Sequence, residues 1–152
     1  MGKYALLVGI GNYAADSGFG KLLSPVKDVD ALRKVLINPE IGDFAEADVT
    51  VLKDAEKSEI EKAIAKLFAK RDADDLLLFY YSGHGDIDKH DNTFYLTGVS
   101  SDRENLAYSA TDGDYLHKRM GKIRFQRQVI ILDCCHSGAI TEDMRAKGTE
   151  KI

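Results

Sequence analysis

Cysteine is scarce in this sequence, and its placement limits what it can do. The 152 residues contain only two cysteines, Cys134 and Cys135, and these are adjacent. Adjacent residues cannot form an ordinary unstrained disulfide, so no disulfide framework supports the fold. Proteins without disulfides are typical of reducing compartments. We therefore expect a cytoplasmic protein.

Long apolar runs and a surplus of basic residues are also missing. No stretch approaches the roughly 20 apolar residues of a membrane-spanning helix, and the apolar run near Met1 is too short for a secretory signal. Lysine and arginine together number 21, against 25 aspartates and glutamates, which gives a net charge of −4. Nucleic-acid-binding domains usually carry a basic face. The sequence therefore predicts neither a membrane partner nor a nucleic-acid partner.

The composition that is present is typical of one soluble globular domain. Apolar residues make up 44% of the sequence and charged residues 30%, which is typical of folded soluble proteins. A chain of this length fits a single domain. Such a domain buries roughly two-thirds of its unfolded surface, so it can fold without disulfides.

Two kinds of apolar segment alternate along the chain. Short continuous apolar runs indicate buried strands, and apolar residues three or four apart indicate helices. Ser24 before a proline is typical of a helix N-cap, and Ser58 with Glu61 forms a capping-box pattern. The predicted strands cover residues 4–10, 49–52, 76–81, 93–96 and 129–132, and the predicted helices follow Ser24, run over 58–70, and run over 111–120 with Thr111 and Asp114 as the cap. This alternation predicts an α/β fold, a mostly parallel sheet flanked by helices on both faces.

Reactive residues follow two of the predicted strands. The strand at 76–81 is followed by S-G-H-G, which contains His84, and the strand at 129–132 is followed by D-C-C-H-S-G, which contains Cys135. In open parallel sheets, functional residues gather at the carboxyl ends of the strands. A cysteine thiolate acts as a nucleophile when an imidazole takes and returns its proton. We therefore predict that Cys135 and His84 form a catalytic pair.

The residues beside this pair have other expected roles. Glycines near a nucleophile let backbone N–H groups face a developing oxyanion, and the N–H groups of Gly85 and Cys135 are the natural donors. Cys134 fits a small buried side chain better than a reactive one. His136 is an alternative base, but neighbouring side chains that leave a strand tend to diverge, which favours His84.

Two competing kinds of site match the pattern less well. A zinc site could use the cysteines and histidines near Cys135, but zinc ligands are usually separated by two or more residues. The segment G-I-G-N-Y-A at 9–14 matches a dinucleotide-binding pattern, but in that pattern a helix begins at once. Here the helix start comes only near Ser24. We therefore predict no metal site and no cofactor, and we expect His90 and His117, which lie in polar stretches, to be solvated.

Four segments, in order, resemble the large-subunit part of the caspase-like peptidases, in particular the metacaspases and prokaryotic caspase homologues. They are L-V-G-I-G-N-Y at 7–13, D-V-D-A-L at 28–32, Y-Y-S-G-H-G at 80–85, and the run at 129–138 that contains D-C-C-H-S-G. The caspase pattern places a histidine about fifty residues before the cysteine. Cys135 lies 51 positions after His84. The resemblance extends along essentially the whole chain.

The resemblance implies a fold, an activity and a specificity. The fold would be the caspase-like three-layer sandwich, with residues 1–152 as one catalytic domain and His84 and Cys135 as its dyad. True caspases hold an aspartate with arginines, whereas metacaspases hold arginine or lysine in an acidic pocket, here with Asp133 and Asp28. The expected function is a cysteine endopeptidase that cleaves peptide bonds after Arg or Lys. From the residues alone, Asp133 could also cap a loop, and Asp28 could be a first-turn helix acid.

The chain also departs from the family pattern. Family members continue past the nucleophile into a small subunit with further strands, and this sequence ends at Ile152. We expect residues 139–152 to be a flexible linker or processing region. A small-subunit chain or a C-terminal segment is the expected partner that completes the sheet, besides the peptide substrate. The alternative function is a non-catalytic caspase-like interaction or scaffold module, against which the intact His84 and Cys135 argue.

Calcium is the one ion considered as an activator. Many metacaspases need it, and carboxylate oxygens suit it. The acidic residues that could supply such ligands are Asp102, Glu104, Asp112, Asp114, Glu142 and Asp143. They are less dense than the acidic cluster of those metacaspases, and charge runs are usually solvated surface. The sequence therefore predicts no cofactor and leaves calcium activation open.

Overall fold

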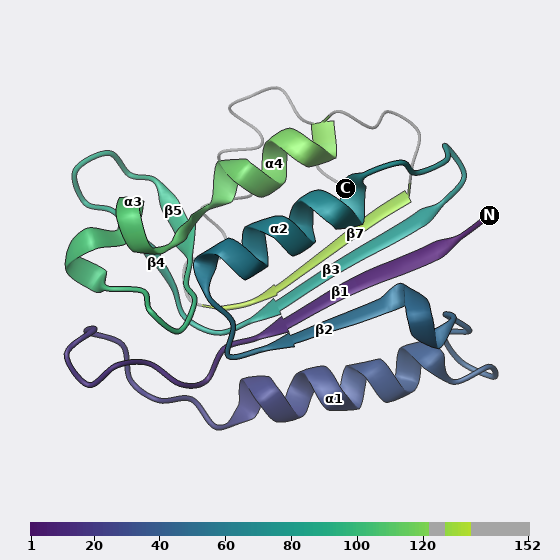
Figure 1. The fold of residues 1–152 in the computed structure, drawn as a ribbon, viewed down its shortest axis with the longest axis horizontal. Helices are drawn as coiled ribbons and strands as arrows, with labels where there is room; N and C mark the ends of the chain where they lie inside the picture. The colour runs from purple at the N-terminus through teal and green to yellow at the C-terminus, as the bar shows by residue number, and fades with distance from the viewer. Residues whose placement is uncertain (122–126, 135–152) are drawn as a thin grey trace.

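A four-stranded parallel sheet forms the centre of the computed structural model, which describes residues 1–121 and 127–134 (Figure 1). The strands stand in the order β2-β1-β3-β7, and all three pairings are parallel. They are β1 (Lys3–Gly9), β2 (Val49–Lys53), β3 (Leu76–Ser82) and β7 (Arg127–Asp133). β1 and β3 are apolar almost throughout because a central parallel strand is covered on both faces. The predicted parallel sheet is confirmed.

Helices cover both faces of this sheet (Figure 1). They are α1 (Ser24–Ile37) on one face, and α2 (Lys57–Phe68) and α4 (Gly113–Gly121) on the other. Side chains of a strand alternate between faces. Leu6 and Val8 of β1 therefore join the core beneath α2, while Ala5 and Leu7 join the core against α1. Within the described residues, no helix is both long and apolar enough to cross a bilayer.

A second, smaller sheet lies at the carboxyl ends of the large sheet's strands (Figure 1). Its antiparallel strands are β4 (Gly85–Ile87), β5 (Phe94–Leu96) and β6 (Thr111–Asp112). The same region contains the one-turn helix α3 (Leu106–Ser109) and a 3-10 turn at Arg103–Asn105, and another 3-10 turn, Glu46–Asp48, precedes β2. Only β5 of these was predicted, because its three residues are all apolar, whereas the other short elements show no apolar run or periodic pattern.

Two helix starts lie one or two positions from where the sequence predicts them. Ser24 is the first residue of α1 and not its N-cap. α4 begins at Gly113, and the Asp112 carboxylate accepts the N–H of Asp114 at 2.8 Å. Thr111, which was predicted to start this helix, belongs to β6 instead. Helix ends are the least certain part of any such prediction, because several polar side chains can cap the same turn.

The predicted capping box of α2 is wrong. The capping pair is Glu56 and Glu59, and the Glu59 carboxylate accepts the Glu56 N–H at 3.1 Å. The helix therefore begins one residue before Ser58. Glu61, the other half of the predicted box, accepts a hydrogen bond from the Thr111 hydroxyl at 3.1 Å. Glu56 and Glu59 have the same spacing as Ser58 and Glu61, so the spacing alone does not show which pair caps the helix. The contact of Glu61 with Thr111 joins residues far apart in sequence, so no local pattern predicts it.

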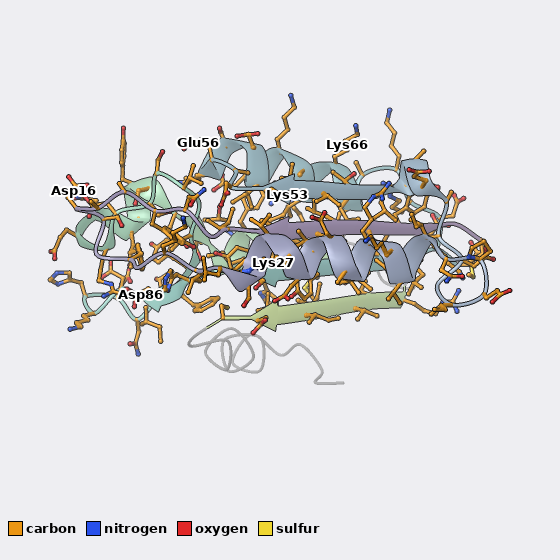
Figure 2. The ribbon with its side chains drawn as sticks, turned by 90° about the horizontal axis from the view of Figure 1, so that it is seen from below. Asp16, Lys27, Lys53, Glu56, Lys66 and Asp86 are labelled. Carbon is orange, nitrogen blue, oxygen red and sulfur yellow. The ribbon has the colours of Figure 1, made fainter. Side chains whose placement is uncertain are left out.

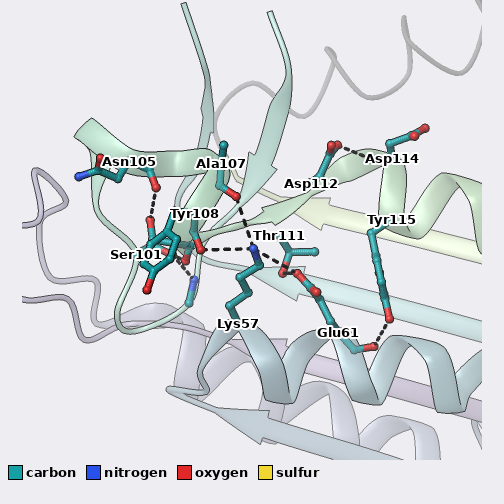
Figure 3. A network of polar contacts seen from close by, with 12 residues as sticks. Lys57, Glu61, Ser101, Asn105, Ala107, Tyr108, Thr111, Asp112, Asp114 and Tyr115 are labelled. Atoms are coloured by element: carbon teal, nitrogen blue, oxygen red, sulfur yellow. Dashed lines mark hydrogen bonds and ion pairs between the residues drawn. The ribbon is translucent and has the colours of Figure 1, made fainter. Parts of the chain in front are cut away.

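Polar contacts fasten the segment after β5 to α2 (Figure 3). The ammonium group of Lys57 donates to the carbonyl of Tyr108 in α3 at 3.3 Å. Glu61 binds Thr111 of β6 through its carboxylate, and its carbonyl accepts the Tyr115 hydroxyl of α4 at 3.0 Å. Helix α2, which packs on the large sheet, therefore holds α3, β6 and α4 in place.

β7 is an edge strand, and its surface on the α1 side is open. Val129 and Ile131 lie on that face and are 41% and 40% exposed. Ile130 and Leu132 point the other way and pack into the core beneath α2. Figure 2, which views the molecule from below, shows β7 beside α1 and not beneath it. An edge strand with exposed apolar side chains is a surface on which another segment can pair.

Asp75 ties the amino terminus to the turn before β3. Its side chain is buried, and its carboxylate accepts the N–H of Gly2 and the N–H of Asp72, each at 2.7 Å. Hydrogen bonds from N–H groups favour the ionised carboxylate. They lower the pKa of Asp75, the bond from Gly2 most and then the bond from Asp72. A carboxyl group that ionises more readily in the folded state stabilises the fold at neutral pH.

We expect acid to weaken the fold partly through Asp75. Its contribution is complete above the ordinary carboxyl pKa of 3.8 and is lost as the pH falls through the lower folded-state value. Asp75→Asn should therefore flatten the fall of the urea midpoint between about pH 4 and pH 2. Asp74→Asn, at an exposed neighbour, should keep the wild-type slope. Equal slopes for wild type and Asp75→Asn would contradict this role.

Candidate active site

β3 and β7 end side by side, and their ends form the edge at which the candidate site lies. Parallel pairing places Ser82 opposite Asp133. The N–H of Gly83 donates to the Asp133 carbonyl at 3.4 Å. His84 and Cys134 therefore follow their strands at the same edge of the sheet.

Of the two cysteines, Cys134 lies within the described residues and Cys135 does not. Cys134 is partly buried and packs against the core beneath α2. Its charge, if ionised, would act on the buried hydroxyl of Tyr81. This packing is typical of a cysteine with a structural role. Cys135, the predicted nucleophile, lies outside the described residues, as do His136 and residues 139–152.

The imidazole of His84 is held by the loop between β1 and α1. Its Nε2 lies 2.7 Å from the carbonyl oxygen of Gly20. Its ring packs edge-on against Tyr13 and at a tilt against Phe19, with centroid distances of 4.9 and 5.3 Å. A carbonyl oxygen can only accept a hydrogen bond, so this contact assigns the proton to Nε2. In the neutral ring, Nδ1 is then the nitrogen that can accept a proton.

This loop is closed at its base. The N–H of Leu22 donates to the Gly11 carbonyl at 2.9 Å. The carboxylate of Asp54, just after β2, accepts the N–H groups of Gly11 and Asn12 at 2.8 and 3.0 Å. A Cβ on Gly11 would lie 2.4 Å from the Leu22 carbonyl oxygen, so the closure requires glycine. The loop therefore presents the Gly20 carbonyl from a fixed base.

The far end of the loop is held by an arginine. The Arg103 guanidinium lies 4.6 Å from the centroid of the Phe19 ring, and its Nε donates to the Asp86 carboxylate at 3.0 Å. The N–H of Arg103 also donates to the Ser17 carbonyl at 2.9 Å. Gly18 has a φ of 85°, which a residue with a side chain rarely adopts. Phe19 thus contacts both the Arg103 guanidinium and the His84 imidazole.

The two glycines around His84 have different surroundings. A Cβ on Gly83 would lie 2.6 Å from the Tyr81 hydroxyl, so the turn out of β3 requires a residue without a side chain. Gly85 is buried and begins β4, where it pairs with Leu96. Lack of space for a side chain thus explains why residue 83 is glycine. Gly85 directly follows His84 at the edge of the site.

Asp28 and Asp133 approach one face of the sheet from different elements. Asp28 lies on α1, and Asp133 ends β7. Burial raises the pKa of the Tyr80 hydroxyl, and the negative charges of Asp133 and then Asp28 raise it further. Such charge interactions fall off with distance. The fold therefore brings both carboxylates, far apart in sequence, into the electrostatic neighbourhood of Tyr80.

The acidic residues considered as calcium ligands are engaged in local contacts where the structure describes them. The Asp102 carboxylate accepts the Glu104 N–H at 3.0 Å, and Asp114 forms an ion pair with Lys118 at 3.3 Å. Among residues 1–121 and 127–134, one set of three possible ligands lies within mutual reach, at the far end of the sheet: Asp72, Asp74 and Asp75. Two further residues considered lie outside the described ones, Glu142 and Asp143.

Several residues around the imidazole were not found from the sequence. Gly20 acts through a backbone carbonyl, which leaves no trace in a side-chain pattern. Tyr13 and Phe19 offered a weak signal, since aromatic side chains in a glycine-rich loop usually find a packed environment.

His117 was expected to be solvated, and that prediction is wrong, because its side chain is buried on α4 beside Asp114.

The chain is similar to known proteins of one family. The caspase domain model matches residues 2–151. Metacaspase-4 of Arabidopsis thaliana is 31% identical over 157 residues, which cover 95% of this chain and 36% of that protein. Metacaspase-8 of the same plant is 30% identical over 159 residues, which cover 95% of this chain and 39% of that protein. The chain thus spans less than half the length of these curated relatives. Since the family match covers nearly every residue, this chain belongs to the caspase-domain family of peptidases.

Proposed function

We propose that this chain is the catalytic part of a cysteine endopeptidase, with Cys135 as nucleophile and His84 as its proton-transfer partner. The observation that carries the proposal is the 2.7 Å hydrogen bond between His84 Nε2 and the Gly20 carbonyl. This hydrogen bond lies at the edge of the sheet where β7 ends, at the first residue of the D-C-C-H-S-G sequence. An imidazole oriented through one nitrogen, with the other able to accept a proton, is what a thiol nucleophile needs.

The reaction follows from these roles. Nδ1 of His84 accepts the thiol proton of Cys135, and the thiolate attacks the substrate carbonyl carbon. The N–H groups of Gly85 and Cys135 stabilise the oxyanion. When the C–N bond breaks, the imidazolium gives its proton to the leaving amine. Water, deprotonated by His84, then attacks the acyl-enzyme and releases the new carboxyl terminus. The Gly20 carbonyl stabilises the imidazolium between these steps.

The substrate residue before the cleaved bond is arginine or lysine in this proposal, held by Asp133 and Asp28. Both carboxylates act on the Tyr80 hydroxyl, which supports their lying around one pocket. Asp133 is two residues before Cys135, where the substrate side chain must pass. A carboxylate pair attracts a cationic side chain and repels an aspartate. The planar guanidinium can bond both carboxylates, which favours Arg over Lys.

A further strand completes the sheet at β7 in the full protein. The support is the open face of this edge strand, where Val129 and Ile131 are about two-fifths exposed. The relatives extend well beyond the matched region. The strand would come from a C-terminal continuation or from a separate small-subunit chain. The expected compartment is the cytoplasm, a location supported by the adjacent cysteines, which cannot form an ordinary disulfide.

Cys135→Ala should abolish covalent labelling by an arginyl thiol-reactive probe, whereas Cys134→Ala should leave most of it. The nucleophile supplies the covalent route, and a neighbour that packs into the core cannot replace it. Mass spectrometry of the labelled peptide, on this chain and on a longer form with the C-terminal continuation, would measure the difference. His84→Ala should slow labelling by about a hundredfold or more.

His90→Ala is the matched control, because His90 is an exposed histidine outside the site. It should label at the wild-type rate. Labelling at Cys134 in place of Cys135 would reverse the assignment. A folded wild-type protein that is not labelled in either form would favour the non-catalytic scaffold function.

A peptide panel that differs only before the cleaved bond should show Arg or Lys preferred over Asp by about a hundredfold or more, since like charges in a desolvated pocket cost several kcal/mol. The measured quantity is kcat/KM for each peptide with the longer form. Asp133→Ala should flatten this preference, and Asp28→Ala should also weaken it.

Asp30→Ala is the control for the pocket. Asp30 lies on the same helix as Asp28 but pairs with Lys53 of β2 at 2.8 Å. Its loss should leave the preference for Arg unchanged. Efficient cleavage after Asp by the wild-type enzyme would refute the acidic pocket.

A further inference from the structure

Two side chains close the backbone of His84 into a ring of hydrogen bonds. The N–H of His84 donates to the Tyr13 hydroxyl at 3.0 Å. The Tyr13 and Thr97 hydroxyls lie 2.7 Å apart. The Thr97 hydroxyl donates to the His84 carbonyl at 2.8 Å. With the Thr97 proton on that carbonyl, Tyr13 is the donor in the contact between the two hydroxyls.

Every member of the ring both gives and receives a hydrogen bond in the same direction. Such chains polarise one another and are stronger in a buried setting than separate bonds. Thr97 is fully buried. Removing one hydroxyl would leave the His84 N–H or the neighbouring hydroxyl without its partner, which is costly away from water. The ring therefore acts as a unit.

Tyr81 braces the ring from β3. Its hydroxyl donates to the His84 and Thr97 carbonyls at 2.9 and 2.8 Å, and it accepts the Thr97 N–H at 3.1 Å. Burial raises the pKa of Tyr13 above its ordinary value and that of Tyr81 well above it. Both hydroxyls therefore keep their protons at neutral pH, and the ring does not change across the range in which a thiol–imidazole pair works.

The hydrogen-bond ring restricts a backbone segment in which glycines flank His84. Gly83 and Gly85 have no side chains with which to fix the turn, and glycine backbone is the least restricted of all. Tyr13 belongs to the loop that also supplies the Gly20 carbonyl, and its ring packs edge-on against the imidazole. One residue thus contacts both the backbone and the ring of the histidine.

We propose that Tyr13 and Thr97 are positioning residues: their closed hydrogen-bond ring fixes the His84 peptide and, through it, the direction of Nδ1. The proposal rests on the proposed peptidase function for its consequence in catalysis. The ring itself is a property of the fold and can be tested without activity. A displacement of about 1 Å in a reacting group can cost about a hundredfold in rate.

The test compares Tyr13→Phe with Tyr115→Phe in this chain. Both variants lose one partly buried tyrosine hydroxyl, and the hydroxyl of Tyr115 donates to the Glu61 carbonyl at 3.0 Å, away from the site. Amide hydrogen exchange measured by NMR should show the His84 N–H about tenfold faster or more in Tyr13→Phe. The Val99 N–H, which donates to the Ala55 carbonyl at 3.0 Å outside the ring, should keep its rate. Tyr115→Phe should change neither amide.

The kinetic arm uses Tyr13→Phe, Thr97→Val and the double variant in the longer form. Each single variant should lower kcat by about tenfold to a hundredfold with KM little changed. The double variant should be no more than about twofold worse than the worse single one, because one break opens the ring. Thr97→Ser, which keeps the hydroxyl, should restore kcat to near the wild-type value.

The possible outcomes separate this inference from the proposed function. Wild-type exchange at the His84 amide in Tyr13→Phe would overturn the inference. So would additive losses in the double variant, or equal losses in Tyr115→Phe. A wild-type protein that never labels at Cys135 would instead refute the peptidase, while amide exchange would still decide whether the ring holds His84.

Discussion

The parallel pairing of β3 with β7 is the interaction on which the candidate site depends. Seven residue pairs fix its register, and the last of them places Ser82 opposite Asp133. A slip by one residue would move every side chain of β7 to the other face. Ile130 and Leu132 would then leave the core that they now contact. Apolar burial on one face of this strand therefore sets where Asp133 and Cys134 lie relative to the strand that leads to His84.

This pairing determines position, but the imidazole also needs a direction. The direction comes from the loop between β1 and α1, which is anchored by Asp54 and closed at Gly11. Phe19 and Tyr13, both from that loop, contact the imidazole ring. Functional side chains work only when their surroundings hold them within a narrow range of orientation. The strands supply the placement through apolar contacts, and the loop supplies the orientation through polar and aromatic ones.

The sequence predicts these two contributions unequally. The strands of the large sheet could be found because continuous apolar runs such as 76–81 record burial on both faces directly. His84 was found because its neighbours form a recognisable pattern at a strand end. The Gly20 carbonyl could not be found, since any residue has one. The role of Thr97 could not be predicted either, because nothing in the local sequence distinguishes it from other buried threonines. Its contact with Tyr13 is formed only by the fold. The asymmetry is physical: burial is periodic along the chain, whereas polar orientation is made by contacts between distant segments.

The same alternation links the open edge of β7 to the proposed specificity pocket. Val129, Ile131 and Asp133 occupy alternate positions of one strand, so their side chains share a face. Any segment that covers the two exposed apolar residues must also approach the carboxylate at the strand's end. In the proposed enzyme, completion of the sheet would therefore also close the acidic pocket. The contacts of His84 described here come from residues 13–97 and do not depend on that event. The residues that orient the imidazole are thus distinct from the residues proposed to hold the substrate side chain.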